Sequence, residues 1–219
     1  ITVLALPSSL NLSLSTASAA WGTPVTLTAQ ATPAQATGTV QFFSDGVLLN
    51  TVPMTAGRAT LSVNQLGVGT RSITARYQGD ARYAPADSPA RSLTVARAVS
   101  TTSLALSSTS AEFGQRVTFT ATVTPALAPG VVVFRDGATV LGQENLVLGS
   151  ASWSSSSLGL GAHSIIAEYL GEPNVIESTS AAAALNVQPA TTTLALAAPA
   201  QVGYNGAIQL TATATSAWG

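Results

Sequence analysis

The chain has 219 residues and a net charge of −1, with only 8% charged and 5% aromatic residues. All eight basic residues are arginine, and they form no basic stripe that would attract nucleic acid. The absence of cysteine excludes disulfides, thiolate metal sites and a cysteine nucleophile. No apolar run reaches the roughly 18 residues of a membrane span. We therefore expect neither a nucleic-acid partner nor a membrane span in this segment.

The chain opens on Ile1–Thr2–Val3, which matches Leu93–Thr94–Val95 and Leu185–Asn186–Val187. The offset between matching residues is 92, since 95 − 3 and 187 − 95 give the same value. The later two triplets each close a repeat. We therefore expect residues 1–11 to be the last strand of a preceding domain followed by a linker.

Residues 12–97 form the first complete repeat, called repeat 1. Apolar and polar side chains alternate along residues 25–30, as in a strand with one buried face. The Asp45–Gly46 pair predicts a hairpin, because glycine takes the positive φ that a tight turn needs. The same reasoning predicts strands near 12–14, 40–42, 48–52, 59–63, 72–77 and 93–95.

Residues 98–188 form repeat 2. The stretch LGVGTRSITARYQGD at Leu66–Asp80 recurs as LGLGAHSIIAEYLGE at Leu158–Glu172, again 92 residues later. A unit of this length is one small domain, so the chain is a tandem array.

Two differences between the repeats carry expectations. Asp136–Gly137 stands one residue early, so Ser44 is expected to be a bulge or loop residue that repeat 2 lacks. Trp153 replaces Leu61, and a neighbour must make room for it.

Residues 189–219 begin a third repeat and stop before its third strand. Two strands cannot bury a core, so this segment is expected to be disordered, or completed by sequence or chains beyond it. The linkers at 96–103 and 188–193 are short and rich in Thr and Val, which favours a limited range of angles between domains. Short strands, frequent turn signals and no helical period predict an all-β chain of antiparallel β-sandwiches.

The chain resembles the bacterial Ig-like repeat domains of large secreted and surface proteins. The resemblance rests on GQRVTFTATVTP at Gly114–Pro125, on the Asp-Gly hairpin and on L-x-x-G-x-x-S-I-x-A-x-Y-x-G. It implies tandem Ig-like sandwiches of about seven strands each, export, and service as a stalk or adhesive module.

The match to antibody-type Ig domains is partial. The positions of the inter-sheet cystine are filled by Ala29 with Ile73 and by Ala121 with Ile165. The position of the tyrosine corner holds Arg71 in repeat 1 and His163 in repeat 2. This departure puts the hydrogen bond of that corner in doubt.

The candidates for chemistry are few. His163 is the only histidine, and its counterpart Arg71 indicates a polar residue at the start of a strand rather than a catalytic base. Carboxylates that could hold Ca²⁺ at domain junctions are Asp80, Asp87, Glu172 and Glu177, but their loose spacing favours solvated loop charge. We predict no catalytic, cofactor-binding or metal-binding residue, no cofactor, and no enzyme.

One aromatic position recurs, as Trp21, Phe113 and Tyr204. A ring there either plugs the end of the sandwich, which is the favoured interpretation, or stacks on a sugar. The leading hypothesis is a structural, adhesive stalk segment of a large exported bacterial surface or extracellular protein. Its partners would be neighbouring Ig-like domains and other copies in a surface assembly. The alternatives are a subunit of an extracellular filament joined by strand addition, and a module that binds a carbohydrate or surface receptor.

Overall fold

The computed structural model describes residues 4–198, 201, 204–205 and 207–218. The strand expected at residues 1–3 lies outside this part. The chain divides into two compact units, one of residues 1–99 with 172–176 and one of residues 100–171 with 177–219. Within the described residues, no helix is long and apolar enough to cross a membrane.

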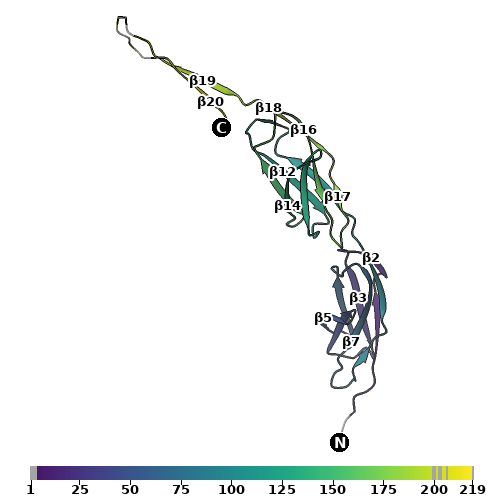
Figure 1. Ribbon diagram of the computed structural model, residues 1–219. Helices are drawn as coiled ribbons and strands as arrows, with labels where there is room; N and C mark the ends of the chain where they lie inside the picture. The colour runs from purple at the N-terminus through teal and green to yellow at the C-terminus, as the bar shows by residue number, and fades with distance from the viewer. Residues whose placement is uncertain (1–3, 199–200, 202–203, 206, 219) are drawn as a thin grey trace. The chain divides into compact units, whose positions relative to one another are not determined.

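Repeat 1 is a sandwich of two sheets (Figure 1). One sheet has the order β1-β3-β6, and the other has the order β2-β9-β7-β4-β5 with β8 paired to β7. The strands are β1 (Ser9–Leu14), β2 (Ser18–Ala20), β3 (Val25–Thr32), β4 (Thr39–Ser44), β5 (Val47–Pro53), β6 (Arg58–Val63), β7 (Gly69–Tyr77), β8 (Ala86–Asp87) and β9 (Arg91–Ala96). Apart from β2 and β8, these are the seven strands that the sequence predicts.

Repeat 2 has the same two sheets, with the orders β10-β12-β15 and β11-β18-β16-β13-β14, and β17 paired to β16. Its strands are β10 (Thr101–Leu106), β11 (Ser110–Glu112), β12 (Val117–Thr124), β13 (Val131–Asp136), β14 (Thr139–Asn145), β15 (Ser150–Ser155), β16 (Gly161–Tyr169), β17 (Ser178–Thr179) and β18 (Ala183–Gln188). The all-β fold of tandem sandwiches is confirmed.

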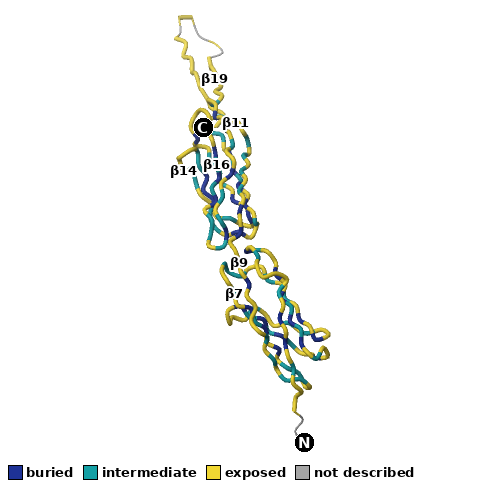
Figure 2. Tube along the Cα trace, turned by 90° about the vertical axis from the view of Figure 1, so that its right-hand side faces the viewer, coloured by how far each residue is buried: buried dark blue, intermediate teal, exposed yellow. Residues whose placement is uncertain are grey.

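The core of each repeat lies between its two sheets. Alternate residues of β3 are buried and the others are more exposed, because successive side chains of a strand point to opposite faces. Figure 2 shows the same alternation as dark blue segments along the strands of both repeats. The four residues at the positions of the inter-sheet cystine, Ala29, Ile73, Ala121 and Ile165, are each 0% exposed. Small and branched apolar side chains therefore fill the space that a cystine would bridge.

The expectation that Ser44 is a bulge or loop residue that repeat 2 lacks is wrong. Ser44 is the last residue of β4 and pairs with Val47, as its counterpart Asp136 pairs with Thr139. Both hairpins therefore have loops of two residues, and each ladder shifts register at the same place, after Phe42 or Phe134. The two hairpins have the same length, and the Asp-Gly pair stands one position earlier in repeat 2 than in repeat 1. Repeat 2 therefore has a counterpart for every residue of this hairpin.

The expectation that a neighbour makes room for Trp153 is confirmed. The indole stacks on Phe119, with ring centroids 5.5 Å apart. On the facing sheet, the residue beside it in β14 is Gly142, and a Cβ there would collide with the indole. The counterpart of Gly142 in repeat 1 is Asn50, since both pair with the same core phenylalanine position.

The third segment is paired rather than disordered over its described residues. β19 (Thr192–Ala197) and β20 (Thr211–Ser216) form an antiparallel ladder of six residue pairs. Every residue of both strands is exposed, which Figure 2 shows as an all-yellow segment at β19. This follows from its two-stranded form, because one sheet has no second sheet to bury its apolar face.

The segment before each repeat is tied to a loop 77 residues later. Leu6 bridges Tyr83, and Ala98 bridges Val175; the bridged residues are 83 − 6 and 175 − 98 residues apart. Both bridges belong to the unit of residues 1–99 and 172–176. Ala98 is 4% exposed, its N–H donates to the carbonyl oxygen of Asn174, and its carbonyl oxygen accepts the N–H of Ile176. This part of the linker is therefore hydrogen-bonded to the loop.

Candidate functional site

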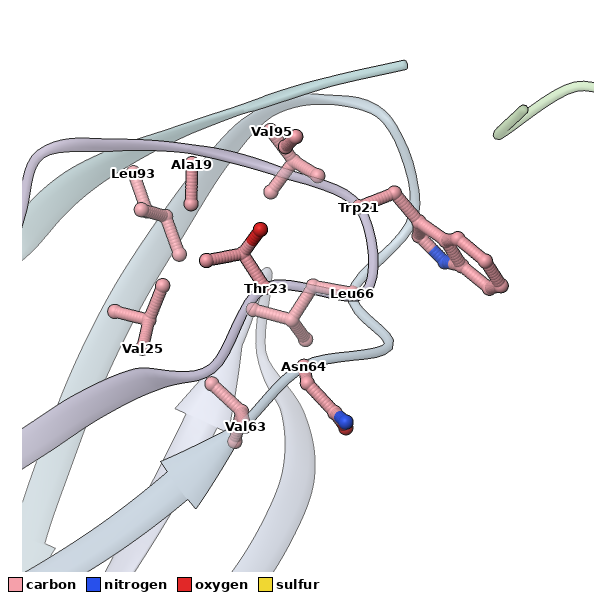
Figure 3. A pocket seen from close by; sticks show the side chains of 10 residues that line it. Ala19, Trp21, Thr23, Val25, Val63, Asn64, Leu66, Leu93 and Val95 are labelled. Atoms are coloured by element: carbon pink, nitrogen blue, oxygen red, sulfur yellow. The ribbon is translucent and has the colours of Figure 1, made fainter. Parts of the chain in front are cut away.

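A small cavity lies where β2 meets the start of β3 and the end of β6 (Figure 3). Its volume is about 10 Å³, which is room for one water molecule at most. It is lined mainly by the apolar side chains of Ala19, Val25, Val63, Leu66, Leu93 and Val95, with Thr23 and Asn64 as polar members. The cavity is a packing defect at the end of a sandwich and is too small to admit an organic ligand.

The recurrent aromatic position differs between the segments. Trp21 is one of the residues that line the cavity and is only 9% exposed, although its indole points away from the other lining side chains in Figure 3. Phe113 is 50% exposed and Tyr204 is fully exposed. Trp153, the other tryptophan of the complete repeats, has Phe119 stacked on it. Neither tryptophan offers an open face of the kind that stacks on a sugar.

His163 sits at the start of β16 with both ring nitrogens engaged. Nδ1 lies 2.7 Å from Oδ2 of Asp136, and Nε2 lies 2.8 Å from the carbonyl oxygen of Gly159. Both partners are hydrogen-bond acceptors, so the contacts favour the doubly protonated imidazolium, whose two N–H groups can donate to both. The Asp136 hydrogen bond raises the pKa of His163, helped by the Gly159 carbonyl and opposed by burial.

Arg71 makes the equivalent contacts in repeat 1. Its Nε donates to the carbonyl oxygen of Gly67 at 2.8 Å, and Nη1 pairs with Asp45 at 3.1 Å. Gly67 and Gly159 are 92 residues apart, as are Arg71 and His163. In place of a tyrosine hydroxyl, the side chain of Arg71 or His163 therefore contacts the backbone carbonyl four residues upstream in each repeat.

Both repeats place an aspartate carboxylate at this corner, although Asp45 and Asp136 do not occupy matching sequence positions. Oδ1 of Asp45 accepts the backbone N–H of Ser72, and Oδ1 of Asp136 accepts that of Ser164. The two serines correspond, whereas Asp45 is a loop residue and Asp136 ends a strand. These contacts lower the pKa of Asp45, and they lower that of Asp136 against the opposing effect of burial. His163 is thus a structural clamp whose nitrogens are not free to accept a proton from a nucleophile.

Asp80 organises the loop that follows β7. Oδ2 accepts the backbone N–H and the hydroxyl of Thr37, each at 2.8 Å. Oδ1 accepts the backbone N–H groups of Arg82 and Tyr83, also at 2.8 Å. The N–H of Thr37, and then that of Arg82, hold the pKa of Asp80 well below its ordinary value. Asp80 is therefore committed to joining two loops.

The structure does not gather the four carboxylates that were considered for Ca²⁺. Asp87 lies 3.8 Å from Arg76 in an exposed ion pair. Among the residues that the structure describes, no group of three or more His, Cys, Asp or Glu side chains is placed to hold a metal ion. Calcium needs several oxygens at once, and this part of the chain supplies no such set.

Two surface grooves, one on each repeat, were not predicted from the sequence. In repeat 1 a groove of about 290 Å³ lies between β5 and β6, lined by Leu49, Asn50 and residues 61–66; in repeat 2 the indole of Trp153 stands at this place. In repeat 2 a groove of about 530 Å³ lies between β10 and β18, lined mainly by Leu104, Leu106 and Leu185 with small residues. The signal was present as two substitutions between the repeats, Leu61 to Trp153 and Arg91 to Ala183.

The family model described as "Bacterial Ig-like domain (group 3)" matches residues 12–96 and 104–188. Among curated proteins, none matches the sequence. Similar solved structures include the fibronectin(III)-like modules of Clostridium thermocellum CbhA, with 14% identity, a TM-score of 0.34, and 82% of this chain and 93% of that chain covered. The human OSCAR ligand-binding domain matches with 17% identity, a TM-score of 0.33, and coverage of 80% and 97%. Likenesses this remote carry no inference about function.

Proposed function

Because the chain belongs to the bacterial Ig-like domain family (group 3), we propose that it is a structural and adhesive segment in the stalk of a large exported bacterial surface or extracellular protein. In this proposal residues 12–97 and 98–188 are two complete stalk domains. Domains of this family are generally non-catalytic and typically extracellular. The candidate side chains fit such a role, because His163 and Asp80 are committed to holding their own repeats together.

The observation that carries the proposal is the pairing of the second strand of each repeat with its last strand. β2 runs parallel to β9 with Ala19 opposite Val95, and β11 runs parallel to β18 with Ala111 opposite Val187. Further backbone bonds extend both ladders: the N–H of Trp21 donates to Ala96, and that of Phe113 donates to Gln188. Both repeats therefore close their ends in the same register.

This arrangement suits a domain that bears tension. A force that pulls the two ends of a repeat apart acts in opposite directions along these paired strands, β2 and β9 or β11 and β18. The evenly spaced hydrogen bonds of a parallel ladder are then loaded together in shear rather than opened one at a time. A stalk needs each domain to resist such a force before its core is exposed.

The mechanical role is tested by single-molecule force spectroscopy on the full chain held at both ends. Ala19→Pro removes a backbone N–H from the ladder of repeat 1, and we expect it to lower the force of one of the two domain-unfolding events. Ala111→Pro is the matched change in repeat 2 and is expected to lower the other. Unfolding forces that stay at the unsubstituted values in both variants would contradict the proposal.

Export is tested separately, on intact cells of the source organism. We expect a protease added outside the cells to cleave the segment, and an antibody against repeat 2 to label the cell surface or the medium. Signal confined to the cell lysate would exclude the exported location. The proposal that the repeats bear tension would still be decided by the force measurements.

A further inference from the structure

The groove between β10 and β18 in repeat 2 has a counterpart in repeat 1 that is already occupied. Arg91, the first residue of β9, reaches across to β1, where its Nε donates a hydrogen bond to the carbonyl oxygen of Leu12 at 2.9 Å. Leu12 is 0% exposed. Repeat 1 therefore covers the edge of its own core with an arginine side chain.

Repeat 2 has the same backbone at this place without the arginine. Ala183 pairs with Ile165 in the way that Arg91 pairs with Ile73. The counterpart of Leu12 is Leu104, which is half-buried instead of fully buried. Its carbonyl corresponds to the one that accepts the bond from Arg91. The groove of about 530 Å³ lies where the missing side chain would be.

The charges of the two repeats point to the kind of group that the groove would accept. Repeat 1 (residues 12–97) has six arginines and three carboxylates, a net charge of +3. Repeat 2 (residues 98–188) has two arginines and six carboxylates, a net charge of −4 with His163 neutral and −3 with it protonated. An acidic domain attracts a cationic partner group at long range.

We propose that this groove binds an arginine side chain of an extended segment of a partner polypeptide, in the position that Arg91 occupies in repeat 1. The aliphatic stem of the arginine covers Leu104 and Leu106, and the guanidinium donates to the carbonyl oxygen of Leu104. β10 ends its sheet in the order β10-β12-β15, so the extended backbone around the arginine can lie along this edge.

His163, which already lines the groove, does not prevent this binding even when it is protonated. His163 is held by Asp136 and by the carbonyl of Gly159. In repeat 1 the corresponding Arg71 is held in the same way, and it lies on β7, which pairs with the β9 strand that carries Arg91. Repeat 1 thus accommodates two cations on these paired strands, each with its own oxygen acceptors.

The binding site goes beyond the stalk role and is tested by methyl NMR of the full chain. The probe is the blocked peptide acetyl-Thr-Arg-Thr-amide, and the matched controls carry Leu or Lys in place of Arg. We expect the arginine peptide to shift the Leu104 and Leu106 methyl signals saturably, with a dissociation constant on the order of 1 mM. The lysine peptide is expected to bind more weakly, because an ammonium group lacks the planar fork of the guanidinium.

Two reciprocal substitutions decide the outcome. Ala183→Arg is expected to fill the groove in cis and weaken peptide binding at least about tenfold, since repeat 1 tolerates arginine at this position in the same register. Arg91→Ala is expected to open a second site, seen as new saturable shifts at Leu12. No saturable shift in the unsubstituted chain, equal shifts with the leucine peptide, or binding unchanged by Ala183→Arg would each overturn the proposal.

Discussion

The indole of Trp153 lies over Gly142 on the facing sheet, and a Cβ added to Gly142 would stand 2.5 Å from Cε2 of that indole. Phe119 and Phe134 complete the cluster, with ring centroids 5.5 and 6.4 Å from the indole. The glycine therefore provides the space that lets a large ring replace Leu61, and we expect the two positions to be energetically coupled.

Gly142→Ala is expected to destabilise repeat 2 by about 1–3 kcal/mol, the usual cost of overpacking a closed site. For a domain of this size, this lowers the midpoint of thermal unfolding by about 5–20 °C. Scanning calorimetry of the full chain measures it as a shift of one transition.

Two variants control this measurement. Asn50→Ala, at the same place in repeat 1, should change stability by less than about 0.5 kcal/mol, as is usual for positions without a packing role. Gly142→Ala combined with Trp153→Leu should lose less than the sum of the two single changes. Strict additivity would show that the indole does not occupy the space above Gly142.

The stability of repeat 2 should depend on the charge of His163. Its pKa is raised above the ordinary value of 6.5, so the stabilisation is complete below about pH 6.5 and is lost as the pH rises through the folded pKa. Asp136, with a pKa lowered from 3.8, adds stabilisation that is present above about pH 4 and is lost as the pH falls through its folded value. Repeat 2 should be most stable between these limits.

Calorimetry between pH 5 and pH 9 tests this dependence, with a change on the order of 1 kcal/mol expected for one charge-assisted hydrogen bond. His163→Arg copies Arg71 of repeat 1 and should abolish the loss at high pH, because arginine stays charged. A transition of repeat 2 that is equally stable at pH 6 and pH 8.5 would contradict the clamp described for His163.

The two buried tyrosines of the repeated motif should respond oppositely to removal of the hydroxyl group. Tyr169 Oη donates to the carbonyl oxygen of Pro129 at 2.8 Å. Tyr77 Oη is buried and has no hydrogen-bond partner within the described residues. Burial, followed by a side-chain interaction of Tyr77 Oη with the Asp80 carboxylate, raises the pKa of Tyr77 to about 12; the geometry of that contact does not qualify as a hydrogen bond. The same side chain is thus satisfied in one repeat and unsatisfied in the other.

Tyr77→Phe should leave the stability of repeat 1 unchanged or raise it by about 1 kcal/mol, because it removes a buried unpaired hydroxyl. Tyr169→Phe should cost repeat 2 about 1 kcal/mol, because it leaves the Pro129 carbonyl without this donor. Each variant controls for the other, since both keep the ring. Equal losses in the two calorimetric transitions would show that Tyr77 has a partner.

The shortest strands could not be predicted from the sequence, because they show no periodic pattern of apolar residues. Ser18–Ala20 and Ser110–Glu112 have three residues each, too few for an alternation to be recognised. They become strands because the chain crosses from one sheet to the other and meets the last strand there. The Asp-Gly dipeptide was misleading for a related reason: hairpin length is set by strand register, while the dipeptide can move within the loop.

The alternation of side chains and the glycine turns were sufficient to predict β-strands, because these signals arise between residues that are close along the chain. The repeat offset of 92 residues then showed that the same set of strands occurs twice. The clamp of His163 and Asp136, the fit of Trp153 over Gly142 and the groove left by Ala183 join residues 27, 11 and about 80 positions apart, as 163 − 136, 153 − 142 and 183 − 104 give. Such contacts depend on how strands pair and how the two sheets face each other. That physical difference is why the sequence specified the architecture, whereas the corner, the aromatic cluster and the grooves emerged only on folding.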